Sequence, residues 1–309
     1  MTGNPLAVTA AGLTFQNPIL LAAGTAAYGR EIDDVTKLSA LGGLVTKAVS
    51  PEPRSGAPAP RVAEFSQGMV NAIGLANPGA AAVREHELPW LATHRGPARV
   101  LVNVVGKVLE DFAEVVAALD ESAGLDGFEL NVSCPNVKAG GLEFGADTAV
   151  LSQLIRRARA ATRRPLFVKL SPILPDVAAT AAAAVDAGAD GITVINTVPG
   201  LVVDVEKRQP AVGFGSGGIS GASILPVGVL ATWRVSRAVR VPICGVGGVR
   251  TAEDALQYIL AGATLVAVGT AGLVDPRAPK RIVGGLERWC AGHDVGALSE
   301  LVGQLRWPA

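Results

Sequence analysis

Short apolar runs recur along the chain, each bounded by glycine, proline or other turn-forming residues. They occupy residues 18–23, 43–48, 100–105, 127–132, 165–170, 191–196, 241–245 and 265–269. Because most are apolar throughout, they are typical of strands buried on both faces of a parallel sheet. Stretches with acid-rich starts and alanine-rich bodies predict intervening helices at 110–123, 147–162, 176–187 and 251–261. Eight alternating β and α units favour a closed (β/α)8 TIM barrel over an open doubly wound sheet.

Two connections are much longer than a barrel crossover needs, namely residues 49–99 and 197–232. Long connections without periodic structure are usually functional, and in a barrel both would follow the carboxyl end of a strand. We therefore expect residues 1–309 to form a single barrel domain with insertions at about 49–99 and 197–232. These insertions should act as lid loops over the C-terminal mouth.

Polar and small residues stand where the predicted strands end. In chain order they are Gly24, Lys47, Asn103, Asn131, Lys169, Asn196, Gly247-Gly248 and Gly269-Thr270. The lysines and asparagines predict a cationic, amide-rich pocket. Glycines after the last two strands let backbone N–H groups approach an anion, and loops in that place commonly bind phosphate. A phosphorylated cofactor or substrate is the leading inference.

One strand end carries a thiol. Residues 129–136 read Glu-Leu-Asn-Val-Ser-Cys-Pro-Asn, and Pro135 cannot continue a sheet ladder. Cys134 is therefore expected at the barrel mouth, between Asn131 and Asn136. A buried structural cysteine is the alternative for this segment alone. The recurrence of polar residues at other strand ends favours a reactive role.

Composition narrows the function classes. The 27 basic residues balance 27 acidic residues, which disfavours nucleic-acid binding. The three cysteines are far apart and lack a C-x-x-C pair, so we predict no metal site, no iron–sulfur cluster in this chain and a reducing cytoplasm. The N-terminus lacks the features of a signal peptide.

Three further features are given structural interpretations. The uncharged stretch 255–274 is interpreted as a helix end, a turn at 261–263 and a buried strand, not a membrane span. The G-x-G-x-x-G at Gly213, Gly215 and Gly218 has no strand before it and no suitable helix after it, so we expect a flexible loop. His86, His94 and His293 do not stand at strand ends, and Cys244 and Cys290 are assigned to the core.

Ordered motifs over about residues 13–274 give the chain a specific resemblance. They are Asn17-Pro18-Ile19 leading to Ala23-Gly24, Thr46-Lys47, Pro53-Arg54, Pro60-Arg61, Gly68 to Gly79, Asn131 to Lys138, Val168 to Pro172, Ile195 to Thr197, Gly217 to Gly221 and Gly245 to Gly248. On these motifs the chain resembles the catalytic subunit of class 1 dihydroorotate dehydrogenases, FMN-containing barrels that oxidise dihydroorotate to orotate in pyrimidine (UMP) biosynthesis.

The resemblance implies roles for residues already singled out. Cys134 would be the general base that removes a proton from C5 of dihydroorotate, and Lys169 the lysine beside flavin N1. The residues implied to bind substrate are Lys47, Asn71, Ala72, Ile73, Gly74, Leu75, Asn131, Asn196 and Thr197. The residues implied to contact FMN are Ala23, Gly24, Lys47, Ala48, Asn103, Asn131, Lys169, Ile195, Gly221, Gly247, Gly248, Gly269 and Thr270. Ala23 departs from the family's usual serine, and Ala222 from its usual proline.

The stretches 137–141 and 195–204 look more like class 1B than the fumarate-using class 1A. Class 1B implies a homodimer joined to a second subunit carrying FAD and a 2Fe–2S cluster, which passes electrons to NAD; together they form a heterotetramer. Class 1A remains the alternative. Further alternatives are a Schiff-base aldolase built on Lys169, a flavin barrel acting on tRNA uridines and a non-enzymatic binding protein that kept the barrel.

Overall fold

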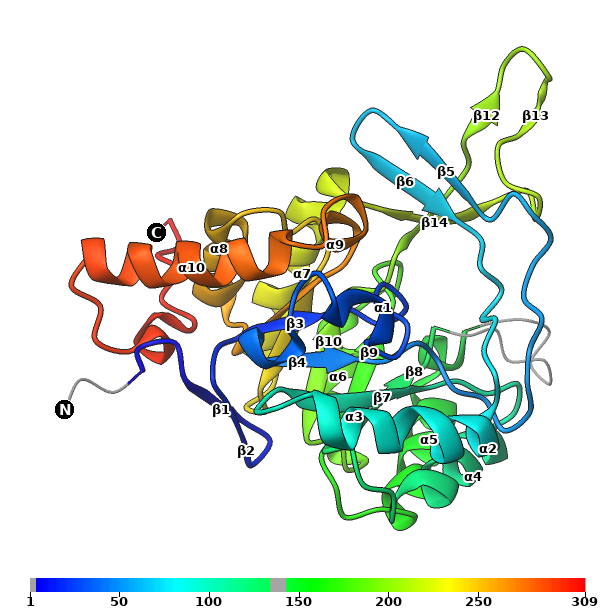
Figure 1. The fold of residues 1–309 in the computed structure, drawn as a ribbon, viewed down its shortest axis with the longest axis horizontal. Helices are drawn as coiled ribbons and strands as arrows, with labels where there is room; N and C mark the ends of the chain where they lie inside the picture. The colour runs from blue at the N-terminus through cyan, green and yellow to red at the C-terminus, as the bar shows by residue number, and fades with distance from the viewer. Residues whose placement is uncertain (1–3, 134–142, 309) are drawn as a thin grey trace.

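Parallel strands close into a barrel in the computed structural model, which describes residues 4–133 and 143–308 (Figure 1). The strand order around the barrel is β10-β15-β16-β3-β4-β7-β8-β9. These strands span Ile19–Leu21 (β3), Gly43–Val45 (β4), Arg99–Val104 (β7), Gly127–Asn131 (β8), Leu166–Leu170 (β9), Gly191–Val194 (β10), Ile243–Val246 (β15) and Leu265–Val268 (β16). Each falls on one of the eight predicted apolar runs, so the predicted (β/α)8 TIM barrel is confirmed.

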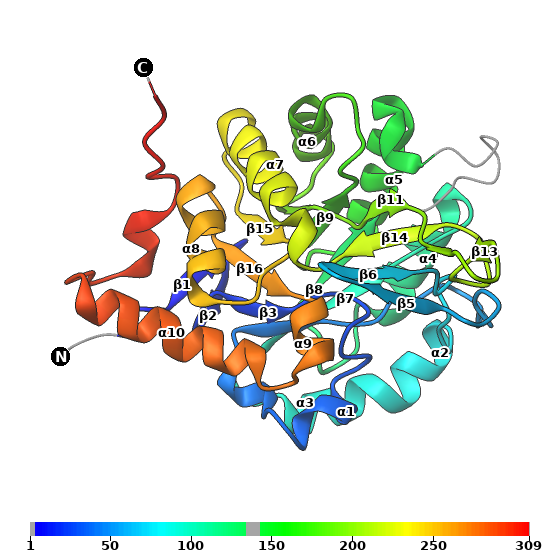
Figure 2. The same ribbon diagram turned by 90° about the horizontal axis from the view of Figure 1, so that it is seen from above.

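Helices surround the strands, as the view from above shows (Figure 2). The four predicted helices are present as α4 (Leu109–Leu119), α5 (Thr148–Ala160), α6 (Val177–Asp186) and α8 (Ala252–Ala261). Asp147 and Asp176 cap α5 and α6 by accepting backbone N–H bonds, which explains the acidic starts. Other helices are α1 (Arg30–Asp33), α2 (Ala80–Ala82), α3 (Leu88–His94), α7 (Leu225–Ala238), α9 (Thr270–Val274) and α10 (Ala278–Gly292). Single helical turns lie at Leu38–Ala40 (η1), Val83–Glu87 (η2), Phe144–Ala146 (η4), Ala222–Ile224 (η5) and Leu298–Leu301 (η6).

The amino-terminal end of the barrel is closed by a hairpin of β1 (Val8–Ala10) and β2 (Leu13–Phe15). Phe15 and Val8 pack in one apolar cluster with inward-facing side chains of the barrel strands, including Leu101 and Phe167. This packing removes apolar surface from water at this end of the barrel, and ligands of this fold bind at the opposite end.

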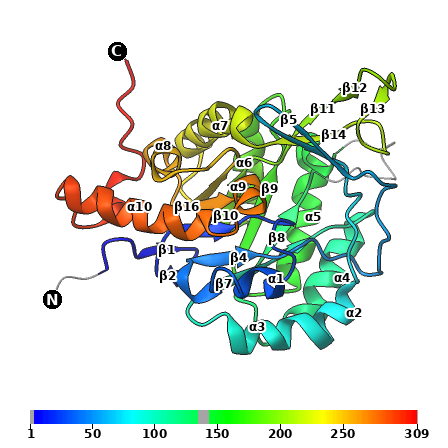
Figure 3. The ribbon, with the colours of Figure 1, turned by 45° about the horizontal axis from the view of Figure 1, so that its top comes forward.

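The two long connections meet in a second sheet at the carboxyl end of the barrel (Figure 3). We call it the mouth sheet, and its strands lie in the order β11 (Val198–Gly200), β14 (Gly217–Ser220), β6 (Gly68–Asn71) and β5 (Val62–Phe65). The antiparallel pair β6–β14 joins the first connection to the second, with Asn71 opposite Gly218. A small hairpin of β12 (Val203–Asp204) and β13 (Gln209–Pro210) extends beyond this sheet.

The structure assigns the uncharged stretch 255–274 and the G-x-G-x-x-G segment 213–218 to definite elements. Residues 255–274 include the end of α8, a left-handed turn at Gly262 and strand β16, as predicted. Within the part of the chain that the structure describes, no helix has the length and apolarity to span a membrane. In the G-x-G-x-x-G segment, Gly215 pairs with Val212 in a tight turn, but Gly218 belongs to strand β14. The expectation of a loop was therefore wrong for the third glycine.

Candidate active site

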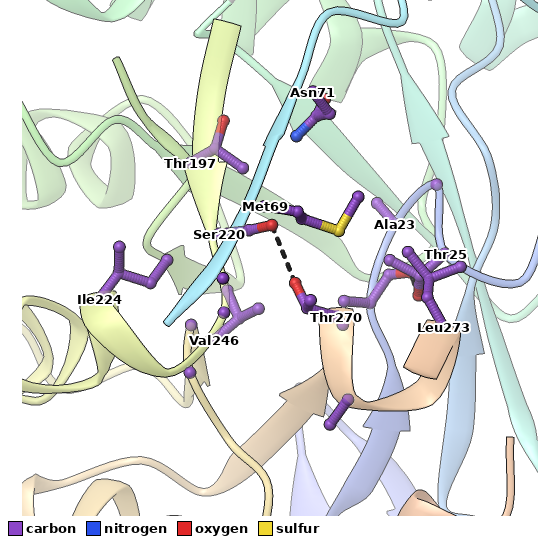
Figure 4. A pocket seen from close by; sticks show the side chains of 18 of the residues that line it. Ala23, Thr25, Met69, Asn71, Thr197, Ser220, Ile224, Val246, Thr270 and Leu273 are labelled. Atoms are coloured by element: carbon purple, nitrogen blue, oxygen red, sulfur yellow. Dashed lines mark hydrogen bonds between the residues drawn. The ribbon is translucent and has the colours of Figure 1, made fainter. Parts of the chain in front are cut away.

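A cavity of about 740 Å³ opens at the carboxyl ends of the barrel strands, between the barrel and the mouth sheet. Figure 4 shows side chains of both regions facing the cavity. Met69 and Asn71 come from β6, Thr197 lies just before β11, Ser220 ends β14, and Val246 comes from barrel strand β15. Predicted residues that line it are Ala23, Gly24, Lys47, Ala48, Asn71, Ile73, Leu75, Asn103, Asn131, Lys169, Ile195, Asn196, Thr197, Gly221, Gly247, Gly248, Gly269 and Thr270. Residues far apart in sequence thus share one chamber.

Two residues predicted to bind substrate, Ala72 and Gly74, are not among those that line the cavity. The N–H of Ala72 donates to the carbonyl of Arg61 at 2.8 Å, and the residue is buried. A side chain at Gly74 would meet the backbone nitrogen of Ala57 at 2.3 Å, so this glycine is needed for loop packing. Cys134 lies outside the described residues, but strand β8 ends at Asn131, a cavity residue.

Two lysines place positive charge at the strand ends that line the cavity. Lys169 is only 7% exposed and stands between Asn131 and Thr193 in the parallel ladder. Lys47 follows β4 and is half-buried. Neither ammonium group has an ion-pair partner among residues 4–133 and 143–308. Cations at a cavity wall without a direct ion-pair partner favour an anionic ligand.

Amide side chains form a linked set beside these lysines. Nδ2 of Asn196 donates to Oδ1 of Asn131 at 3.1 Å, and Oδ1 of Asn196 accepts the N–H of Thr197 at 2.9 Å. Asn71 reaches from the mouth sheet and donates to the carbonyl of Gly218 at 3.0 Å. These bonds hold the amides in fixed orientations, so they can present defined donors and acceptors to a flat polar ring.

Comparisons with known proteins agree with this geometry. Residues 5–289 match the family model described as dihydroorotate dehydrogenase. The chain is 46% identical to dihydroorotate dehydrogenase B (NAD(+)), catalytic subunit, of Pelobacter propionicus, covering 97% of this chain and 98% of that protein. The protein of the same name from Geobacillus kaustophilus is 44% identical, covering 97% and 96% respectively. The chain belongs to the dihydroorotate dehydrogenase family.

Dihydroorotate dehydrogenases are flavoproteins, so the cavity must be tested for its fit to a phosphate-bearing flavin. Gly247 and Gly248 have φ of 127° and 76°, and a Cβ on Gly248 would lie 2.7 Å from the backbone nitrogen of Leu225. A Cβ on Gly221 would lie 2.6 Å from Cα of Gly68. Side chains are excluded here, and the backbone is free to approach a phosphate. The residues fit the group.

The hydroxyl of Tyr258 supports this glycine turn from behind. It donates to the carbonyl of Gly247 at 2.7 Å, and burial raises the pKa of this phenol, which keeps it protonated as a donor. The tyrosine ring occupies space beside Gly228 and Gly245, where added side chains would clash with it. Sequence reasoning missed Tyr258 because its role depends on helix α8 packing against β15.

The other two cysteines are unsuited to base catalysis. Cys244 and Cys290 are each 1% exposed, as the assignment to the core required. Burial raises the pKa of Cys244, with the negative charge of Glu129 adding to the effect and Lys169 opposing it. Burial also raises the pKa of Cys290. None of the three histidines lines the cavity, and His94 and His293 stack on Trp90 and Trp289 instead.

The structure adds residues that the strand-end reading did not single out. Ser220 accepts a hydrogen bond from the hydroxyl of Thr270 at 2.8 Å across the cavity wall (Figure 4). Below the cavity, Glu129 is buried and hydrogen-bonded to Asn103 and Thr193. Its signal was present in the sequence, since Glu129 lies two residues before Asn131 and so faces the same side of a strand.

Proposed function

We propose that this chain is the FMN-containing catalytic subunit of an NAD-linked dihydroorotate dehydrogenase, which oxidises (S)-dihydroorotate to orotate. The observation that carries the proposal is the cavity itself. Within a family of dihydroorotate dehydrogenases, it brings together two lysines, the amide set and the glycine turn. Bound FMN would supply the two-electron chemistry that amino-acid side chains lack.

The oxidation removes a proton from C5 of the substrate and a hydride from C6. Cys134 is proposed to take the C5 proton, which requires part of the thiol to be ionised; neighbouring cations and dipoles lower a thiol pKa from about 8.5. The cationic character of the cavity, provided by Lys47 and Lys169, supports this role. Cys244 and Cys290 are buried and cannot replace it.

Binding of the substrate is assigned to the charged and amide groups of the wall. The carboxylate of dihydroorotate would pair with Lys47, and the alternating N–H and C=O groups of its ring would pair with Asn71, Asn131 and Asn196. Lys169, deeper in the barrel, would stabilise negative charge on a reduced flavin. Ala23 lines the cavity without a polar side-chain group, so no hydroxyl contact with the flavin is available there.

A spectrum tests the cofactor assignment. The purified chain should be yellow, with flavin absorption bands that bleach when dihydroorotate is added under anaerobic conditions. Borohydride with a ketone substrate should trap no covalent adduct on Lys169, since a Schiff-base aldolase would form one. A colourless protein that neither binds added FMN nor bleaches would refute the proposal.

The electron acceptor is proposed to be NAD, reached through a partner subunit with FAD and a 2Fe–2S cluster. The relatives are named NAD(+) enzymes and catalytic subunits, which supports both parts. A homodimer of this chain with two partner subunits would form a cytoplasmic heterotetramer. The chain alone should reduce artificial dyes but not NAD, and should gain NAD reduction when co-expressed with that subunit. Efficient fumarate reduction by the chain alone would overturn the choice of acceptor but leave the dihydroorotate half-reaction standing.

A further inference from the structure

Glu129 is a carboxylate enclosed within the barrel, on the face of β8 that also carries the cavity residue Asn131. It is 1% exposed. Its Oε1 accepts from Nδ2 of Asn103 at 2.7 Å, and its Oε2 accepts from the hydroxyl of Thr193 at 2.8 Å. Each carboxylate oxygen therefore has one donor, from strands on opposite sides of β8. Burying a carboxylate is costly unless such donors satisfy its oxygens.

Lys169 is a cation in the same part of the barrel interior. This residue is the direct neighbour of Thr193 in the β9–β10 ladder, and Thr193 is a hydrogen-bond donor to Glu129. The charges of Glu129 and Lys169 both act on the thiol of Cys244, in opposite directions, so the three side chains share one part of the barrel interior. The test of Glu129 therefore includes one variant that conserves the net charge of this region.

The second observation concerns Asn103. Its side chain is fully buried, and its NH2 group is committed to Glu129, since Nδ2 of Asn103 donates to Oε1 of the carboxylate. The amide carbonyl must therefore point the other way. That oxygen is buried without a hydrogen-bond partner in the described part of the chain, and Asn103 lines the cavity. A buried acceptor left without a donor is destabilising, so it marks a place that a ligand completes.

We propose that Glu129 is a positioning residue of the cofactor cavity. It fixes the orientation of the Asn103 amide, so that the oxygen without a protein donor is the group available to an N–H or O–H donor of the bound ring. The proposal rests on the cavity being the flavin site. It predicts that positions 103 and 129 must form one donor–acceptor pair that leaves an oxygen of residue 103 able to accept, whichever of the two residues carries the charge.

Four variants test this requirement. Glu129→Met removes the acceptor, so Asn103 loses its fixed orientation, and the Kd for FMN should rise about tenfold, or about 1.4 kcal/mol. Glu129→Gln keeps an acceptor for Asn103 and can donate to the Thr193 hydroxyl, so its Kd should stay within about threefold of the wild type. Asn103→Asp places two carboxylates face to face and should weaken binding at least tenfold. The swap Asn103→Asp with Glu129→Gln restores one donor–acceptor pair and the net charge, and should recover the affinity to within about threefold.

Binding is measured at neutral pH by removing FMN from the holoenzyme and following the quenching of flavin fluorescence as FMN is added back. Thr193→Val is the matched control, because it removes the other hydrogen bond of Glu129 without touching Asn103. It should lower the unfolding temperature and leave the Kd nearly unchanged. Should Asn103→Asp fail to fold, the Glu129→Met and Glu129→Gln pair still decides the question.

Some outcomes would refute the role of Glu129, and another would refute the proposed function. A swap variant that binds FMN no better than Asn103→Asp, or a Glu129→Met variant with wild-type affinity, would overturn the positioning role of Glu129. A wild-type chain that binds no FMN at all would instead refute the proposed function, on which the role depends.

Discussion

The two ends of the barrel are built from the same strands but hold opposite kinds of side chain. In β9, Phe167 belongs to the apolar cluster at the amino-terminal end, and Lys169, two residues later on the same face, lines the cavity. In β7, Leu101 and Asn103 differ in the same way. One end is sealed by the β1–β2 hairpin, and the other is covered by the mouth sheet.

This difference separates stability from chemistry within single strands. Apolar burial at the amino-terminal end and beneath the helices provides the driving force for folding. The carboxyl-terminal end can then hold buried cations, an unpaired amide oxygen and left-handed glycines, all of which cost stability when no ligand is bound. Substitutions at the two ends should therefore fail in different measurements.

The largest effect is expected from Cys134→Ala. Loss of the proposed base should lower the rate of flavin reduction by dihydroorotate about 10²–10⁴-fold, while FMN stays bound. Stopped-flow absorbance measures this rate. Cys134→Ser should retain a little activity, mostly at high pH, because a hydroxyl ionises less readily than a thiol. The matched control is Cys244→Ala, a buried thiol that should be dispensable for the rate. A near-normal rate of flavin reduction in the Cys134→Ala variant would refute the assignment of Cys134 as the general base.

Phe167→Ala tests the sealed end. The ring is fully buried and occupies the space over Gly191, where even a Cβ would lie 2.3 Å from it. Its removal should lower the free energy of unfolding by about 3–5 kcal/mol, while the folded fraction retains flavin absorption. Chemical denaturation measures the loss. Phe214→Ala is the control, because this side chain is 69% exposed and its removal should cost less than about 0.5 kcal/mol. Equal costs for the two would show that the sealed end is not the stabilising one.

Lys169→Ala should harm the cofactor more than the fold. Without the ammonium group, the chain should either release FMN or hold it with a lower reduction potential, because negative charge on the reduced ring loses a stabilising cation. Flavin content and a redox titration provide the two measurements. Lys280→Ala removes the same charge from the exposed face of α10 and should change neither. Unchanged potential and affinity in Lys169→Ala would assign this lysine a structural role.

The smallest effect is expected from Gly248→Ala. Its φ of 76° and the nearby Leu225 make a side chain unfavourable, so FMN affinity should fall several-fold along with about 1 kcal/mol of stability. Gly303→Ala is closely matched, with φ of 75° and no atom within 4 Å of the added Cβ. It should lose stability alone, since Gly303 lies outside the cavity. If both variants bind FMN like the wild type, the glycine turn is not the phosphate site.

Much of the barrel and its polar end could be predicted because the signals are local. A strand buried on both faces is a run of apolar residues, and a parallel barrel brings all carboxyl ends together, so the residue after each run is a candidate for the site. Lys47, Asn131 and Asn196 were found in this way, and all line the cavity. The roles proposed for them still come from the family, because position alone does not specify a substrate.

Tertiary structure decided whatever depends on register between distant strands. The β6–β14 pairing joins Asn71 to Gly218, 147 residues later, and no local sequence pattern predicts this pairing. The same is true of Glu129, whose partners Asn103 and Thr193 lie on strands brought together by barrel closure. Apolar periodicity and strand ends are properties of one segment, so the sequence by itself determined the barrel and the residues at its mouth. Hydrogen bonds across the interior depend on how the strands are staggered, which only the closed barrel decides.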